Sequence, residues 1–265
     1  MSDFRNAQEK DGSEAGGSRI IGRVLPAAVK LWLRSQLESI EQLDIQLKGR
    51  DRQIVSGRLP KVAVSAESAV YQGIHLSRAT LSAEDIRINI GQVIRGKPLR
   101  LLKAFPVLGE VSLAAEDLNT SLGSDLLADG LQNFWQGLTQ VASLAQEIES
   151  RYGQLPLQSD MRLHNPQVAL AHRQLGLSFY PQTPRQTSDM PVILGAEMAI
   201  ASGRLLQILS ARWLETLSEL SDPTEGIAIR SLEGFQWDLG KDTQIDQLVL
   251  QPDYLLCRGQ LQVNP

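Results

Sequence analysis

Four basic residues within a short apolar stretch are the clearest candidates for chemistry in this sequence. Residues 86–105 read IRINIGQVIRGKPLRLLKAF, which places Arg95, Lys97, Arg100 and Lys103 among apolar neighbours and contains no acid. Basic side chains in such a setting suit a phosphate group. The phosphate could belong to a nucleotide, a nucleic acid or a lipid, and a plain solvated surface is the alternative interpretation.

Nucleotide and nucleic-acid ligands have little support. The sequence has neither GxGxxG nor GxxxxGK[ST], the loops whose backbone cradles nucleotide phosphates. The basic stretch contains one aromatic residue, Phe105, whereas proteins that bind single strands interleave several aromatics with their cations. A net charge of −4 is also unlike that of a protein that coats nucleic acid. We therefore expect no nucleic-acid partner.

The residues that could catalyse a reaction do not form a recognisable set. Cys257, the only cysteine, lies in a strand-like run and is interpreted as a small sheet or core residue. His164 and His172 are eight residues apart, without the spacing of zinc ligands. No pair of carboxylates is spaced for general acid and base catalysis. The sequence thus predicts no enzyme activity, no metal and no cofactor.

Charge is unevenly distributed along the chain. Residues 19–61 hold nine basic and four acidic side chains, residues 86–103 hold five basic ones and no acid, and residues 104–150 hold seven acids and no base. We therefore expect an electrically polarised molecule. The first amphipathic segment carries a second basic stripe, made of Arg19, Arg23, Lys30 and Arg34.

Two amphipathic segments that would have to position these residues are predicted to be helices. The first spans residues 19–41. The second spans residues 124–152, begins at Ser124 as its cap, and would be on the order of 40 Å long at about 1.5 Å per residue. Its apolar side chains recur at steps of three and four and include Leu127, Leu131, Phe134, Leu138, Val141 and Ile148.

The rest of the sequence is typical of strands. Residues 42–113 alternate with a period of two, which predicts an antiparallel meander, and strands return from residue 161. Residues 205–220 are ambiguous between strand and helix. The order of helix, strands, long helix and strands predicts an α+β fold with a curved, mainly antiparallel sheet. We expect residues 1–18 to be a disordered tail and residues 19–265 to be one domain.

The absence of an apolar run typical of a signal peptide or a membrane span favours a cytoplasmic protein that touches membranes at most peripherally. A long amphipathic helix against a curved aliphatic sheet could leave a groove suited to acyl chains. The predicted lining comprises Leu127, Leu131, Phe134, Leu138, Val141, Ile148 and Trp32. The same side chains could simply fill a core, so an interaction or scaffold domain without a lipid ligand is the alternative.

Several phrases resemble the LmeA-like family of bacterial phospholipid-binding proteins. They are DRQIVSGRLPKVAVSAESAVYQGIHLS, IRINIGQVIRGKPLRLL, GEVSLAAEDLN and DLGKDTQIDQLVLQPDYLLCRGQLQV. The resemblance covers about residues 35–263 and implies a fold similar to tubular lipid-binding (TULIP-like) proteins, with long helices wrapped by a curved sheet. It also implies lipid binding or transfer without catalysis. An anionic phospholipid is then the expected partner, and the eight basic residues of the two stripes are expected to face its headgroup or a membrane surface.

Overall fold

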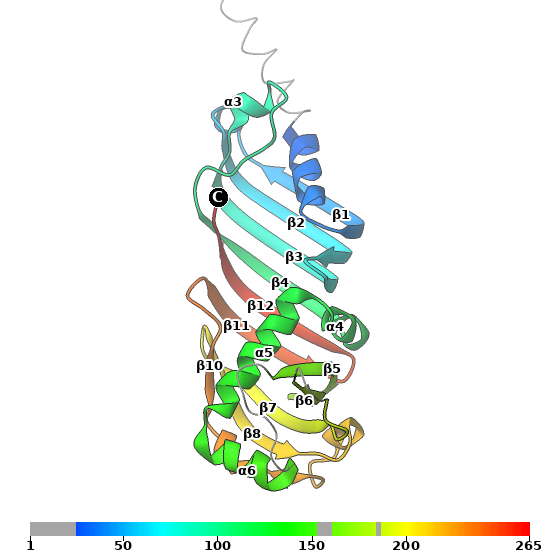
Figure 1. The fold of residues 1–265 in the computed structure, drawn as a ribbon. Helices are drawn as coiled ribbons and strands as arrows, with labels where there is room; N and C mark the ends of the chain where they lie inside the picture. Colours follow the sequence, from blue (N-terminus) through cyan, green and yellow to red (C-terminus); the bar gives the residue numbers. More distant parts are fainter. Residues whose placement is uncertain (1–24, 153–160, 184–186) are drawn as a thin grey trace, which may run out of the picture.

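The computed structural model describes residues 25–152, 161–183 and 187–265. The predicted tail, together with Arg19 and Arg23, lies outside these ranges. The chain forms an elongated molecule in which two antiparallel sheets follow one another along the long axis (Figure 1). Among the described residues, no helix has the length and apolar character needed to cross a bilayer.

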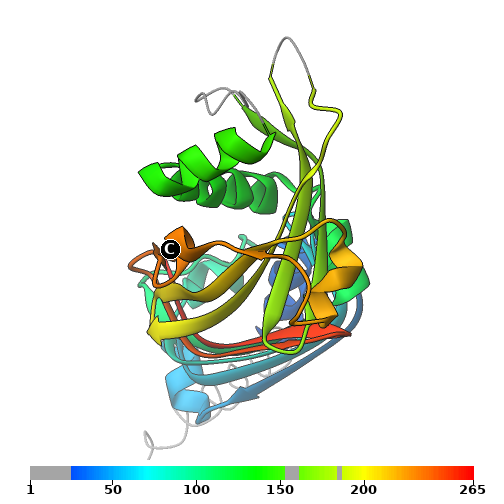
Figure 2. The ribbon, with the colours of Figure 1, turned by 90° about the horizontal axis from the view of Figure 1, so that it is seen from below.

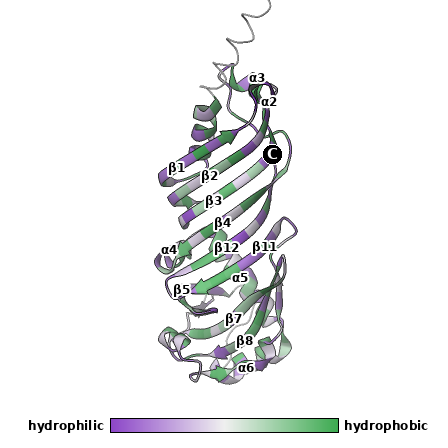
Figure 3. Cartoon of the chain, turned by 180° about the vertical axis from the view of Figure 1, so that it is seen from behind, coloured by the Kyte–Doolittle hydropathy of each residue, from purple (hydrophilic) through white to green (hydrophobic). Residues whose placement is uncertain are grey.

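The first sheet has the strand order β1-β2-β3-β4-β12-β11. Its strands are β1 (Ser39–Lys48), β2 (Arg58–Tyr71), β3 (Ile74–Arg87), β4 (Phe105–Ala114), β11 (Thr243–Gln251) and β12 (Tyr254–Val263). Strands β1 to β4 form the predicted meander, whereas β12 returns from the end of the chain to pair with β4. Hydrophobic and hydrophilic residues alternate along these strands, as the bands in Figure 3 show, because one face of the sheet is covered and the other is exposed.

The second sheet has the order β10-β8-β7-β6-β5, with β9 paired to β8. Its strands are β5 (Arg162–Ala171), β6 (Gln174–Gln182), β7 (Val192–Ser202), β8 (Leu205–Trp213), β9 (Ile227–Ala228) and β10 (Gln236–Asp238). Seen along the long axis, both sheets curl around the helices (Figure 2). The predicted curved antiparallel architecture is therefore present, but it is divided between two sheets.

The helices are shorter than predicted. Besides a helix over residues 25–35, they are α2 (Asp51–Val55), α3 (Ile90–Val93), α4 (Ala115–Ser121), α5 (Asp125–Thr139), α6 (Ala142–Tyr152) and the 3-10 turns η1 (Leu217–Ser221) and η2 (Arg230–Leu232). The first helix ends at residue 35, and not at residue 41 as predicted, because β1 has already begun at residue 39. Residues 205–220 divide into β8 and η1.

The prediction of a single helix over residues 124–152 is also wrong. The chain forms two helices there, with a break at Gln140 and Val141. The Thr139 hydroxyl donates a hydrogen bond to the backbone oxygen of Gln136, at 2.9 Å. Such local bonds compete with helix propagation, and the β-branched Val141 is a weak helix former. The predicted start is confirmed, since the Ser124 hydroxyl accepts a hydrogen bond from the backbone N–H of Leu127.

The two halves of the molecule have separate apolar cores. In the lower half of Figure 1, α5 and α6 pack against the second sheet around Trp135, Leu138 and Phe179, all essentially inaccessible to solvent. In the upper half, the helix of residues 25–35 places Leu25 and Val29 on the first sheet. Neither core extends over the whole concave face of the first sheet.

Helix α4 joins the two halves. The side-chain amide of Asn119 donates to the backbone oxygen of Val168 at 2.7 Å, and its oxygen accepts from the Val168 N–H at 2.9 Å, which ties α4 to β5. The Ser121 hydroxyl accepts from the His75 N–H at 2.8 Å, which ties the same helix to β3. A short helix thus fixes one sheet to the other through backbone partners.

Candidate functional site: an apolar groove

The middle of the concave face of the first sheet forms a groove beneath the helix of residues 25–35. Cross-strand pairing aligns inward-facing residues into rows, and the central row crosses all six strands. This row consists of Ile45, Val64, Leu81, Gly109, Gly259 and Ile245. The positions in it therefore set the depth of the groove.

Two glycines face each other in this row on adjacent strands. Gly109 of β4 pairs with Gly259 of β12, so neither strand projects a side chain at this point. Glycine inside a strand weakens the strand and often marks a close approach of another group. Alanine recurs in the neighbouring rows, where Ala66 pairs with Ala79. Small residues therefore keep the centre of the sheet free of long side chains, while the end of the Leu81 side chain lies beside Gly109 and the backbone of β11 lies close to Gly259.

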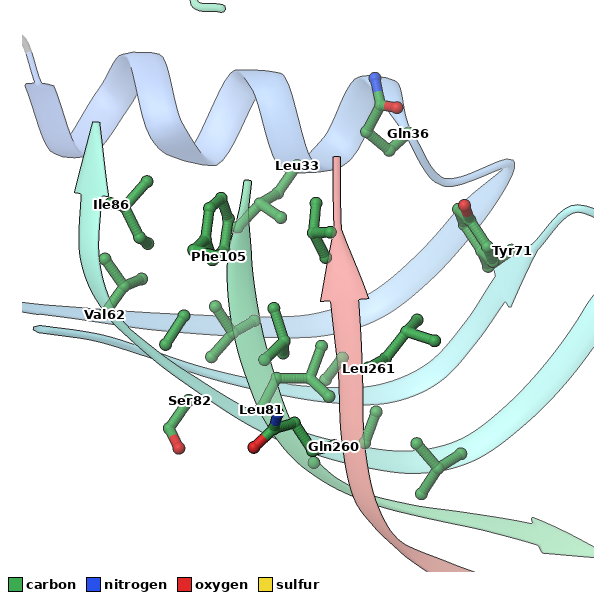
Figure 4. Close-up of a pocket in the computed structure, with 18 of the residues that line it drawn as sticks. Leu33, Gln36, Val62, Tyr71, Leu81, Ser82, Ile86, Phe105, Gln260 and Leu261 are labelled. Atoms are coloured by element: carbon green, nitrogen blue, oxygen red, sulfur yellow. The ribbon is translucent and has the colours of Figure 1, made fainter. Parts of the chain in front are cut away.

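The cavity has a volume of about 690 Å³, within the usual range for small-molecule sites. Its roof comes from Val29, Trp32 and Leu33 of the first helix. Figure 4 shows Leu33 directed toward the sheet, with Ile86 and Phe105 in the space between the sheet and the helix. Gln36 lies at the C-terminal end of this helix, and Tyr71 of β2 lies near the same end.

No charged side chain is found among the described residues that line the groove. The polar lining residues are neutral, and they are Gln36, Ser82, Thr243, Gln244, Gln260 and Asn264, together with the hydroxyl of Tyr71. An uncompensated charge would be costly to bury among the remaining aliphatic groups. The lining therefore suits a hydrocarbon chain and disfavours an ionised group.

Cys257 lies in the groove lining, one row away from the glycine pair, where it is opposite Val111. Burial raises the pKa of its thiol above the ordinary value, because a thiolate is poorly solvated there. A reactive cysteine is usually activated by a lowered pKa. The interpretation of Cys257 as a sheet residue agrees with this position.

The position of Cys257 gives a first prediction. Alkylation of the purified protein by a neutral maleimide should be slow at neutral pH and should accelerate at a higher pH than for an exposed thiol, because the raised pKa leaves less thiolate. Loading the protein with phospholipid should slow the reaction further by covering the sulfur. Mass spectrometry of the modified protein over time would measure both effects. Equal rates for loaded and unloaded protein would place the lipid away from Cys257.

The structure places the seven predicted lining residues in two different regions. Trp32 lines the groove. Leu138 and Ile148 are fully buried in the core of the lower half. The other four, Leu127, Leu131, Phe134 and Val141, pack against that core. The helical stripe that was expected to cover a groove thus forms a packed interior in this structure, and the shorter first helix forms the roof.

The four basic residues of the stretch IRINIGQVIRGKPLRLLKAF remain together in the fold. Arg95, Lys97, Arg100 and Lys103 are all exposed on the segment 94–104 between α3 and β4, which we call the tip loop. Figure 1 shows α3 and this loop at one end of the molecule. On its buried side, the tip loop contributes Leu99 and Leu101 to the groove lining. Lys30 and Arg34 are exposed on the first helix.

The histidines identified in the sequence do not form a metal site with other described residues, since no group of three potential ligands occurs among them. His164 belongs to β5, and His172 lies in the turn between β5 and β6. The Nδ1 atom of His172 lies 3.3 Å from the side-chain oxygen of Gln251.

The concave face of the first sheet thus holds a preformed cavity with a neutral, largely apolar lining. A family model described as LmeA-like phospholipid-binding matches residues 16–260, which is almost the whole chain. The chain therefore belongs to the LmeA-like phospholipid-binding family, as its sequence phrases indicated. Comparison with curated proteins and with solved structures gives no match.

Sequence reasoning missed the glycine pair and most of the groove floor. Gly109 and Gly259 each interrupt an otherwise strand-like run, VLGEVSL and LLCRGQL. An isolated glycine in a strand can indicate a close backbone approach. That signal was available locally, but it could not show that the two glycines are neighbours, because β4 and β12 are far apart in the sequence.

Proposed function

We propose that this protein binds a phospholipid by holding an acyl chain in the groove beneath the first helix, and that it carries or presents this lipid without chemical change. The observation that carries the proposal is the apolar cavity of about 690 Å³ on the concave face of the first sheet. Membership of a phospholipid-binding family supports the same ligand class.

The lining also indicates how the lipid is oriented. A phospholipid has apolar chains and an ionised phosphate, and only the chains match a lining without charge. Burying the phosphate there would incur a large desolvation penalty with no cation to offset it. The headgroup therefore stays at the mouth of the groove, where the polar termini of the lining residues and the solvent can reach it.

Burial of the chain supplies enough driving force. Each methylene transferred from water to an apolar site contributes about 0.8 kcal/mol, so a chain that is only half enclosed still gains several kcal/mol. Part of this gain is offset by the ordering of the chain and of nearby side chains. The proposal needs no catalytic group, and it assigns none to Cys257 or to the histidines.

The direct test blocks the groove with the substitution Gly109→Leu. A leucine at position 109 would project into the centre of the groove, and its nearest obstacle is the flexible end of Leu81, whose Cδ2 lies 2.7 Å from a Cβ built at this position. We expect the variant to fold and to lose most of the phospholipid that co-purifies with the wild type. Mass spectrometry of lipids extracted from natively purified protein would measure the loss.

Thr80→Leu is the matched control, since it adds a leucine to the adjacent strand at an exposed position. This control should retain the lipid. Wild-type protein without any lipid, even after incubation with phospholipid micelles, would favour the alternative that the chain is an interaction or scaffold domain. Equal lipid content in the two variants would place the binding site elsewhere.

A further inference from the structure

The tip loop combines features that are seldom found together on a plain solvated surface. Two large apolar side chains stand out from it, with Ile94 46% exposed and Leu102 60% exposed. They alternate with the exposed cations Arg95, Lys97, Arg100 and Lys103. None of these four cations forms an ion pair with an acid in the described parts of the chain.

The acids that flank the tip loop in sequence are paired with other cations, and Glu110, which follows the loop, pairs with Arg258. Glu84 accepts a hydrogen bond from the Lys61 ammonium at 3.0 Å. Asp85 forms ion pairs with Arg58 and Arg87. These flanking acids therefore do not neutralise the positive charge of the tip loop.

Hydrogen bonds and a buried side chain fix the conformation of the tip loop. The Asn89 side chain donates to the backbone oxygen of Pro98 at 3.0 Å and accepts from the Arg100 N–H at 2.7 Å. The Leu102 N–H donates to the backbone oxygen of Arg87 at 2.9 Å. Leu99 is buried beneath the loop against the first helix. These contacts fix the backbone in the arrangement that exposes Ile94 and Leu102.

The tip loop and the segment that follows it in the sequence carry charges of opposite sign. The segment 104–150, with seven acids and no base, runs through β4, α4, α5 and α6 toward the far end in Figure 1. An anionic surface would attract the tip and repel this segment, so the molecule would approach with its long axis directed at that surface.

We propose that the tip loop docks the protein on an anionic lipid bilayer, with the four cations among the headgroups and with Ile94 and Leu102 inserted between them. Cations beside exposed apolar groups match the two layers of a membrane interface. Docking brings one end of the groove to the bilayer, because Leu99 and Leu101 of the same loop line it. This inference rests on the proposed function for its biological purpose, but the docking itself does not require a lipid in the groove.

Vesicle flotation tests the docking. The wild type should float with vesicles of phosphatidylcholine that contain phosphatidylglycerol, and much less with phosphatidylcholine alone. Reversal of Arg95, Lys97, Arg100 and Lys103 to Glu should weaken binding on the order of a hundredfold or more, because each basic residue near an anionic surface contributes about a fivefold factor. The double variant Ile94→Ser and Leu102→Ser should lose the part of the binding that survives high salt, which screens charges but leaves insertion intact.

A matched control reverses four exposed cations of the lower half, Arg151, Arg162, Arg230 and Lys241, and it should float like the wild type. Reversal of Lys30 and Arg34 on the first helix should have a smaller effect than reversal of the tip. Circular dichroism melting curves would verify that every variant is folded. Loss of flotation only in the first-helix variant, or equal flotation of the wild type and the tip variants, would overturn the proposal, as would a wild type that does not float.

Lipid content separates this inference from the proposed function. Tip variants should still take up phospholipid from detergent micelles, since their groove is unchanged. The Gly109→Leu variant, in turn, should still float with the vesicles. A wild type that floats but never holds lipid would leave the docking standing and reject the carrier function. Tip variants that bind RNA or an acidic protein more weakly, while floating normally, would assign the cations to that other partner and contradict docking.

Discussion

Replacing Leu138 by Asp should reduce the free energy of unfolding by several kcal/mol and leave little folded protein at physiological temperature. Leu138 is fully inaccessible to solvent in the core formed by α5, α6 and the second sheet. The substitution removes the buried methyl groups, which alone costs about 2–5 kcal/mol. It also places a carboxylate where the core described here offers no compensating charge. Urea unfolding followed by circular dichroism would measure the change.

Leu126→Asp is the control for this substitution. Leu126 belongs to the same helix, α5, but is 50% exposed. An acid in the first turn of a helix interacts favourably with the helix dipole, so we expect a change within about 0.5 kcal/mol. Similar losses in both variants would mean that α5 does not tolerate an acid on any face, and the assignment of the Leu138 face to the core would lose its support.

The second large effect is expected at Gly259. A Cβ built there would lie 2.1 Å from the backbone oxygen of Gln244 and 2.9 Å from the Cα of Ile245. Both obstacles are backbone atoms of the neighbouring strand, which cannot rotate away as a side chain can. Gly259→Ala should therefore force β11 and β12 apart and destabilise the protein by about 1–3 kcal/mol, the usual cost of overpacking.

Its partner across the strand pair should behave differently. At Gly109 the nearest atom to a built Cβ is the end of the Leu81 side chain, which can change rotamer. Gly109→Ala should consequently cost less than Gly259→Ala, and the loss of glycine flexibility in the unfolded chain offsets part of that cost. Comparing the urea midpoints of the two variants would check the order. A reversed order would show that the close approach of β11 to Gly259 is not a constraint on stability.

The parts of the fold that could be predicted are those encoded locally. Alternation of Val62 and Val64, or of Ile86 and Ile88, is visible within a few residues, so the meander of β1 to β4 was predictable. The pairing of β12 with β4 was not, because it joins residues such as Glu110 and Arg258 that are 148 positions apart. No local pattern specifies which distant strand completes a sheet.

The position of the groove could not be predicted for a related reason. Leu138 in a closed core and Val29 above a cavity both belong to amphipathic stripes of the same kind. A stripe shows only that a face is covered, and what covers it depends on the tertiary arrangement. The basic residues of the tip were easier to identify, because four cations without an acid form an unusual run that survives in the fold as one exposed loop.

The absence of charge from the described groove lining has a consequence for how the protein could change over evolution. A neutral lining distinguishes hydrocarbon chains by their length and branching, but it does not distinguish the headgroups attached to them. Under the two proposals, different residues choose the cargo and the membrane: those on the floor of the sheet and those at the tip. Substitutions at the tip could then redirect the protein to another bilayer while the cargo stays the same, and relatives could combine one groove with many destinations.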